Sequence, residues 1–219
     1  MDDSTTVKII DLAFDYAEPS VNIVSDWYFL LGLVLLLVIA YFIRRKLKEN
    51  NFPIVEMDVE ISGTPRTKFK AKRDDSNIYI ANRIYIELIT RKAAIPFDEK
   101  EDVIYEVYNS WYKLFGIIRD EIKNVPGHFL RTHKSTNALI GLTTKILNEG
   151  LRPHLTRYQA KFRKWYEAEL DKNSSIGKTP QQIQSEYEYY TELVEDMKRV
   201  NKILIDYAAE LKKLIEGKY

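Results

Sequence analysis

The sequence predicts a mainly α-helical protein: a single N-terminal transmembrane helix followed by a short β-hairpin and a cytosolic antiparallel helical bundle. Three patterns predict this architecture. An apolar run at residues 27–43, WYFLLGLVLLLVIAYFI, contains no charged or amide side chain. Residues 55–61 and 67–72 alternate polar and apolar side chains, which is typical of strands. From residue 75 onward, apolar residues recur every three or four positions, which is typical of helices.

Composition limits the classes of protein to which the chain can belong. The 219 residues are 45% hydrophobic and 30% charged, which is enough for one core beyond the membrane helix. The 33 basic and 32 acidic residues nearly balance, so any anion-binding surface must be local. Because the chain has no cysteine, disulfides, thiolate metal sites and cysteine nucleophiles are excluded. We divide the chain into an acidic extracytoplasmic segment (1–26), the transmembrane helix (27–43), a basic flank with the hairpin (44–73) and the bundle (74–219).

The apolar run would be about 25 Å long as a helix, at the short end of what crosses a bilayer. Aromatic residues lie at both ends, and the RRKLK segment that follows can reach lipid headgroups. A buried helix of a soluble protein is the alternative, but such a helix usually has a polar face, which residues 33–39 lack. A signal peptide would begin with basic residues, whereas residues 1–26 hold six acidic residues and one lysine. This charge asymmetry predicts an N-terminus outside the cell and a cytosolic C-terminal part.

Residues 4–18 are expected to form a short amphipathic helix that ends at Pro19. This helix either lies on the outer leaflet or packs with its copies around the outer mouth of an oligomeric pore. In the second case Asp11, Asp15 and Asp26 would line the mouth and favour cations.

The hairpin is predicted from IVEMDVEIS and TKFKAK, which flank a Gly-Thr-Pro turn at 63–65. Its polar face sets acidic side chains opposite lysines, and such cross-strand pairs contribute about 0.2–1 kcal/mol each. The alternative is that the basic residues form a patch for nucleic acid or lipid; these residues are Lys68, Lys70, Lys72 and Arg73.

The predicted helices span about 75–95, 98–125, 135–172 and 179–216, with the soft linker NSSIGK before the last. Asp98 and Glu101 form a capping-box-like start for the second helix. The third is expected to break or kink at Gly150 and to restart at Pro153. Apolar residues of the last helix occupy three columns of a heptad, so it packs in the bundle alone or also contacts its copies in neighbouring subunits.

No catalytic motif is present: the sequence has no HExxH, GxSxG, GxGxxG or phosphate-loop pattern. The three histidines lack the spacing of metal ligands. We therefore expect neither enzymatic activity nor a metal or cofactor.

Two basic and aromatic stretches, HFLRTHK and RPHLTRYQAKFRKWY, form the best candidate for a binding site. Their basic side chains could hold phosphates through charge-assisted hydrogen bonds, with aromatic rings available for stacking. The alternatives are a solvated basic face neutralised by nearby glutamates, or a face against anionic headgroups. The candidate ligand-binding residues are Arg131, His133, Lys134, Arg152, His154, Arg157, Lys161 and Lys164.

The stretches RIYIELITRKAAIPFDEKEDVIYEVYNSWYKLF and ILNEGLRPHLTRYQAKFRKWYE resemble segments of small bacterial single-span membrane effectors. Such effectors are paired with nucleotidyltransferases in anti-phage systems of the Hailong kind. The resemblance implies a homo-oligomer in the bacterial inner membrane whose spans form an ion-conducting pore and whose cytosolic domain senses an oligonucleotide. It assigns no site residue, because no diagnostic motif carries it.

One apolar helix per subunit cannot conduct, so a pore requires several copies around an axis, and we favour a tetramer. We expect a nucleotide or oligonucleotide at the basic residues to shift subunit packing and to open a pore that depolarises the membrane. The alternative is a membrane-anchored scaffold whose bundle recruits a cytosolic protein.

Overall fold

The computed structural model describes residues 11–15, 20–24, 27–50, 52–61, 66–172 and 175–217. The chain divides between Phe52 and Pro53 into two compact units, which are described separately.

The first unit contains an antiparallel pair of short strands, β1 (Asp11–Asp15) and β2 (Ser20–Val24). The prediction of a helix over residues 4–18 is therefore wrong for residues 11–15. A helix this short is marginal by itself, whereas pairing with the β-branched segment SVNIV satisfies its backbone groups. Asp11 and Asp15 are the end residues of β1 and pair with Val24 and Ser20. Asp26 and the rest of the predicted helix lie outside the described residues.

The helix α1 (Trp27–Asn50) contains the predicted apolar run and continues through the basic flank. Its Trp27–Leu47 segment has a mean hydropathy of 2.2, and its side chains are exposed. By length and composition, it is the one helix of the described residues that could cross a membrane.

The second unit begins with the predicted hairpin, β3 (Ile54–Val59) and β4 (Thr67–Lys72). The register confirms the predicted charge pairing: Glu56 lies opposite Lys70, and Asp58 lies opposite Lys68. Lys70 Nζ is 2.9 Å from a Glu56 carboxylate oxygen. Val55, Met57 and Val59 of β3 are buried, because β3 packs on α9 and β4 packs on α5.

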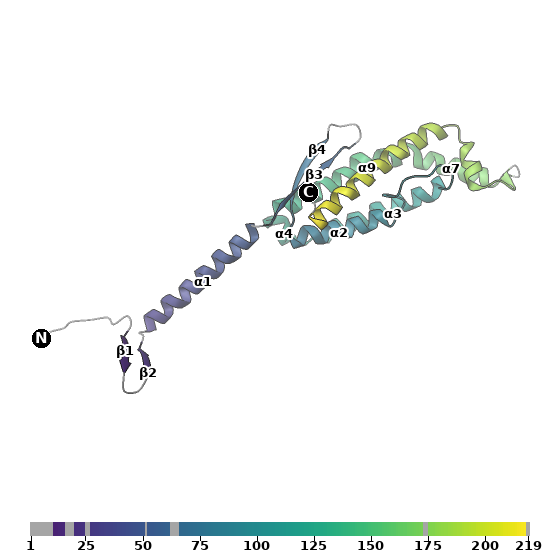
Figure 1. The fold of residues 1–219 in the computed structure, drawn as a ribbon. Coiled ribbons are helices and arrows are strands. Elements are labelled where there is room, and N and C mark those ends of the chain that lie inside the picture. Colours follow the sequence, from purple (N-terminus) through teal and green to yellow (C-terminus); the bar gives the residue numbers. More distant parts are fainter. Residues whose placement is uncertain are drawn as a thin grey trace. The chain divides into compact units, whose positions relative to one another are not determined.

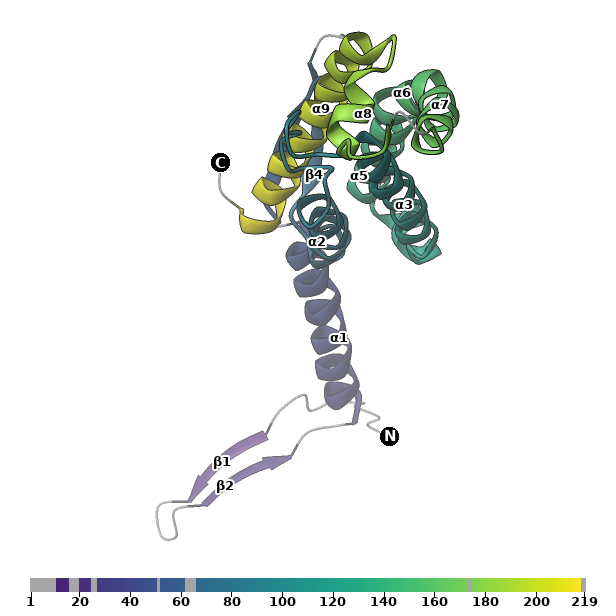
Figure 2. The same ribbon diagram turned by 90° about the vertical axis from the view of Figure 1, so that its right-hand side faces the viewer.

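The rest of the second unit is helical, and its helices run side by side around one core (Figures 1 and 2). The α-helices are α2 (Asp75–Ile89), α3 (Ile104–Lys123), α4 (Gly127–Thr132), α5 (Lys134–Lys145), α6 (Arg152–His154), α7 (Ala160–Leu170), α8 (Pro180–Ser185) and α9 (Tyr190–Glu216). Two π-helical segments, η1 (Ile146–Leu151) and η2 (Leu155–Gln159), join α5, α6 and α7 into one helical path.

Helix α3 begins at Ile104, later than predicted. The Asp98 side chain instead accepts hydrogen bonds from the backbone N–H groups of Lys100 and Glu101, which makes a turn. The helix is capped from far along the chain, because the Gln184 side chain accepts from Ile104 N at 2.8 Å and donates to Asp102 O at 3.0 Å.

The predicted last helix is divided in two. Thr179 and Gln182 form the expected capping box, but the helix that they start, α8, ends at Ser185. Helix α9 begins at Tyr190 and ends at Gly217, which has a φ of 69° and closes the helix in the left-handed conformation.

No break occurs at Gly150, because the π segments carry the helix through it. Buried side chains and Gly150 recur at a strict spacing of four, at residues 146, 150, 154, 158, 162 and 166. In a pure α-helix, each four-residue step would drift by about 40° around the axis. A π turn holds one more residue than an α turn, so the π segments offset this drift and keep the row facing inward.

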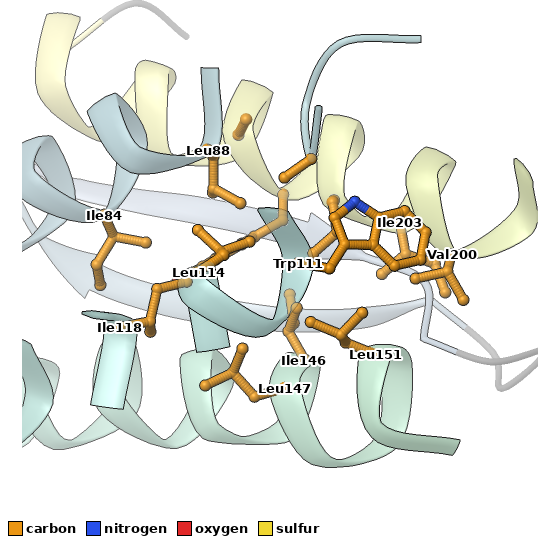
Figure 3. Close-up of a cluster of buried hydrophobic side chains, with 14 of the residues drawn as sticks. Ile84, Leu88, Trp111, Leu114, Ile118, Ile146, Leu147, Leu151, Val200 and Ile203 are labelled. Atoms are coloured by element: carbon orange, nitrogen blue, oxygen red, sulfur yellow. The ribbon is translucent and has the colours of Figure 1, made fainter. Parts of the chain in front are cut away.

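The core of the second unit is apolar and densely populated by side chains from every major helix (Figure 3). Trp111 is fully buried at its centre, and its ring N–H donates to Lys92 O at 2.7 Å. In Figure 3, Val200 and Ile203 of α9 and residues of η1 lie beside Trp111, while Ile84 and Leu88 of α2 lie farther along the same core.

Candidate anion-binding groove

The structure does not bring the two predicted basic stretches together. Arg131 and Lys134 are exposed at the corner between α4 and α5. His133 is half-buried at the same corner and stacks on Phe129, with ring centroids 5.5 Å apart. Arg152 lies 18 residues beyond Lys134 along the helical path, a rise of about 27 Å. One ligand of nucleotide size cannot contact both groups.

His154 is fully buried, so its prediction as a phosphate-binding residue is wrong. Its Nδ1 lies 2.7 Å from Asp196 Oδ2, and its Nε2 lies 3.1 Å from the Tyr108 hydroxyl. Burial lowers the pKa of His154 despite the opposing effect of Asp196. We infer a neutral ring that donates from Nδ1 to the carboxylate and accepts from Tyr108.

Arg157 is exposed, and it pairs with Glu192 of α9. One of its terminal nitrogens donates to Glu192 at 2.5 Å, and its guanidinium lies 5.1 Å from the centroid of the Tyr158 ring. Tyr158 also donates to Glu192, at 2.9 Å. Glu192 is thus an acidic partner of this basic edge other than the expected Glu149, Glu167 and Glu169. Lys161 and Lys164 are exposed on α7.

Arg152 is the predicted residue that lies in a hollow. Its guanidinium carbon is 4.9 Å from the centroid of the Phe115 ring, and its Nε donates to Asn148 at 3.1 Å. The hollow, here called the arginine hollow, has a volume of about 280 Å³. It is lined by Phe115, Arg119, Ile122, Lys123, Thr144, Leu147, Asn148 and Arg152.

A second hollow lies along the same seam between α3 and the helical path from α5 to α7. We call it the polar hollow, and its volume is about 500 Å³. It is lined by Asn109, Tyr112, Lys113, Leu155, Thr156, Gln159, Ala160 and Arg163. The two hollows together are called the groove below.

The groove is cationic, because its lining includes arginine and lysine but no carboxylate among the described residues. Arg119, Lys123 and Arg152 line the arginine hollow together with the apolar side chains of Phe115, Ile122 and Leu147. Lys123 pairs with Asp120 at 3.3 Å on the exposed surface. Exposed pairs of this kind contribute about 0–1 kcal/mol, so Lys123 can exchange Asp120 for a ligand.

Other hollows have a different charge. The hollow between α2 and α3 is lined by Arg83, but both oxygens of Glu121 bind this arginine. The hollow at Ile176 to Glu186 also includes a carboxylate. Among the described residues, these hollows are therefore less suited to an anion than the groove.

Sequence reasoning missed Arg119 and Lys123, because the acidic residues of the RDEIK segment mask them in a simple charge count. Helical spacing could have found them. Tyr112, Phe115, Arg119 and Lys123 follow one another by three or four residues along the edge of α3 beside the buried stripe.

The groove can hold an anion, but its lining does not supply an evident reaction. No group of three or more His, Asp or Glu side chains suited to a metal ion occurs among the residues described. The Tyr108, His154 and Asp196 chain is directed inside the bundle and lines neither hollow.

No family model matches the chain, and no curated protein or solved structure matches it either.

Proposed function

We propose that the protein is an oligomeric single-span membrane effector that binds a nucleotide or oligonucleotide in the groove and opens a pore in response. The observation that carries this proposal is that Arg119, Lys123 and Arg152 line one hollow whose lining includes no carboxylate among the described residues. The ligand site thus moves from the predicted edge of the helix to the groove, with Arg152 common to both.

Phosphate suits this arrangement chemically. A guanidinium binds two phosphate oxygens at once, and charge-assisted hydrogen bonds of this kind are about twice as strong as neutral ones. Arg119 and Lys123 lie one helical turn apart on α3, whereas Arg152 comes from the opposite wall. A phosphate between the walls would therefore join α3 to the helical path from α5 to α7.

The second part of the proposal is the pore. Residues 27–43 of α1 expose apolar side chains along their whole length, as a helix in lipid does. Several copies around an axis could conduct, and we favour four. The N-terminus would be outside the cell in the bacterial inner membrane, with Asp11, Asp15 and Asp26 near the outer mouth. The family resemblance adds anti-phage defence as the setting and a nucleotidyltransferase as the source of ligand.

The test uses the full chain in lipid nanodiscs and planar bilayers. Nucleoside monophosphates and short oligonucleotides are titrated calorimetrically, and conductance is recorded with and without them. We expect binding and ligand-dependent conductance in the wild type, and loss of both in Arg119→Glu and Arg152→Glu. The matched control Lys164→Glu reverses an exposed charge outside the groove. Absence of binding by the wild type, or equal binding by the groove variants, would refute the proposed sensing role.

The alternative function is a membrane-anchored scaffold. It is favoured by exposed apolar side chains near the α7–α9 end of the bundle, where Ile176 is 81% exposed and Tyr189 is 50% exposed. Size measurement of the detergent-solubilised protein separates the two functions. A monomer without conductance supports the scaffold, and a tetramer or larger ring supports the pore.

A further inference from the structure

We infer that the two hollows form one bipartite site, in which the arginine hollow binds the phosphate and the polar hollow binds the base of a nucleotide. The inference deepens the proposed function, on which it rests, by assigning base recognition to Tyr112, Thr156 and Gln159.

Helix α3 forms one wall of both hollows, and the distance between the hollows along this helix suits a nucleotide. Tyr112 and Arg119 lie seven residues apart on the same side of α3, which corresponds to a rise of about 10 Å. This length matches that of a nucleoside monophosphate in an extended conformation. The opposite wall runs in parallel from Asn148 and Arg152 to Thr156 and Gln159.

Tyr112 provides a surface on which a planar ring can stack. Its side chain is 69% exposed, although it lies on a helix whose other face is buried in the core. A base that stacks on this ring would cover apolar area that now faces water, and such stacking contributes to binding whatever the base. Lys113 adds one cation beside it.

Thr156 and Gln159 can read the edge of the stacked ring. Gln159 offers an amide donor and an amide acceptor, and Thr156 offers a hydroxyl group. Within the described part of the chain, neither side chain is hydrogen-bonded to another residue. Arg163, by contrast, donates to Tyr105 at 3.0 Å and to Asn109 at 3.2 Å, so it forms a fixed end wall.

The π segments give an independent reason to place a ligand here. Segment η1 contributes Leu147 and Asn148 to the arginine hollow, while η2 contributes Leu155, Thr156 and Gln159 to the polar hollow. Single π turns are rare and occur often at functional sites. A purely α-helical path would present different side chains at both positions.

The test measures binding of two probes, inorganic phosphate and AMP, to the full-length protein in detergent. We expect AMP to bind more tightly than phosphate. Tyr112→Ala should weaken AMP binding about tenfold or more without affecting phosphate, since stacking is removed and the cations remain. Arg119→Ala should weaken both. Tyr189→Ala removes an exposed tyrosine that lies outside the groove, and it should change neither.

Base recognition is tested by ranking AMP, GMP, CMP and UMP. Gln159→Ala should alter this ranking, because it removes the donor and acceptor that face the ring edge. If Tyr112→Ala and Gln159→Ala leave nucleotide binding unchanged while Arg119→Ala abolishes it, the bipartite site is wrong and the sensing role survives. Wild-type protein that binds phosphate but binds AMP no better also overturns the inference. If the wild type binds none of the probes, the inference and the proposed function both fail.

Discussion

The 2.7 Å contact between His154 Nδ1 and Asp196 Oδ2 joins the helical path from α5 to α7 with α9 inside the bundle. Tyr108 extends the contact to α3, and Arg199 holds the other oxygen of Asp196 at 2.6 Å. Burial tends to raise the pKa of Asp196, but the hydrogen bonds from His154 and Arg199 keep it below its ordinary value. The carboxylate therefore stays charged and fixes the neutral tautomer of His154.

This arrangement predicts that the fold loses stability as the pH falls below about 6.5. The pKa of His154 in the folded state is lowered from that value, so the unfolded chain takes up the proton first. The contribution of neutral His154 to stability is fully present above the pKa of His154 in the unfolded chain. It decreases as the pH falls from that pKa toward the lower pKa of His154 in the folded state. Thermal melting between pH 7.5 and 5.5 should show a fall for the wild type.

The matched variants identify the source of this pH dependence. His154→Gln should remove most of the fall between pH 7.5 and 5.5, even if it lowers the melting temperature at every pH. His128→Gln replaces an exposed histidine and should leave the fall in place. A wild-type melting temperature that does not change over this range would contradict a neutral buried His154.

A second prediction concerns the remote cap of α3. Gln184 is fully buried and satisfies the backbone of both Ile104 and Asp102. Gln184→Ala leaves these two groups without their partner, and each buried unsatisfied group costs about 1–3 kcal/mol. Chemical denaturation should show a loss of about 2–4 kcal/mol in the free energy of unfolding. The exposed neighbour variant Ser185→Ala should lose less than about 1 kcal/mol, and an equal loss for both would contradict the role of Gln184.

Local sequence patterns predicted the structural features that depend on residues close together in the sequence. The apolar run, the alternating hairpin and the Thr179–Gln182 capping box could each be recognised within about twenty residues. The start of α3 could not, because its cap comes from Gln184, 80 positions away. The same applies to the candidate site. The spacing of His154 places it beside the basic residues of the same helix, but its side chain is buried and hydrogen-bonded to Asp196 and Tyr108, which are distant in the sequence. Helical spacing could have identified Arg119, but the sequence could not show that Arg152 lines the same hollow from the opposite wall.

A third prediction compares two glycines with positive φ. Gly217 has a φ of 69°, and a Cβ placed there would lie 2.7 Å from Arg73 Nε. Gly177 has a φ of 84° but has open space around it. Both Ala variants should lose about 1–2 kcal/mol from the left-handed backbone. Gly217→Ala should lose more, because Arg73 must move and release its 2.9 Å hydrogen bond to Ile215 O.

Urea denaturation of a double-mutant cycle tests the extra loss at Gly217. In an Arg73→Ala background, Gly217→Ala should cost only as much as Gly177→Ala. If the two glycine variants are equally unstable with Arg73 present, then the contact with Arg73 has no effect on stability.

The last prediction tests whether the π turns hold extra residues. Deletion of Glu149, which is exposed within η1, should convert the π segment to an α-helix and leave the phase of later residues unchanged. Helix α9 has no π turn near the exposed Glu195, so deletion of Glu195 would rotate every later buried residue by about 100° around the helix axis. We expect a loss of less than about 2 kcal/mol for the first deletion, and a loss of more than about 3 kcal/mol, or failure to fold, for the second.

Because Asn148 would also move, the Glu149 deletion should weaken phosphate binding in the arginine hollow while the bundle stays folded. Circular dichroism melts measure the stability of both deletion variants, and phosphate titration measures binding by the variant that folds. Similar losses of stability in the two variants would contradict the prediction that η1 holds one extra residue.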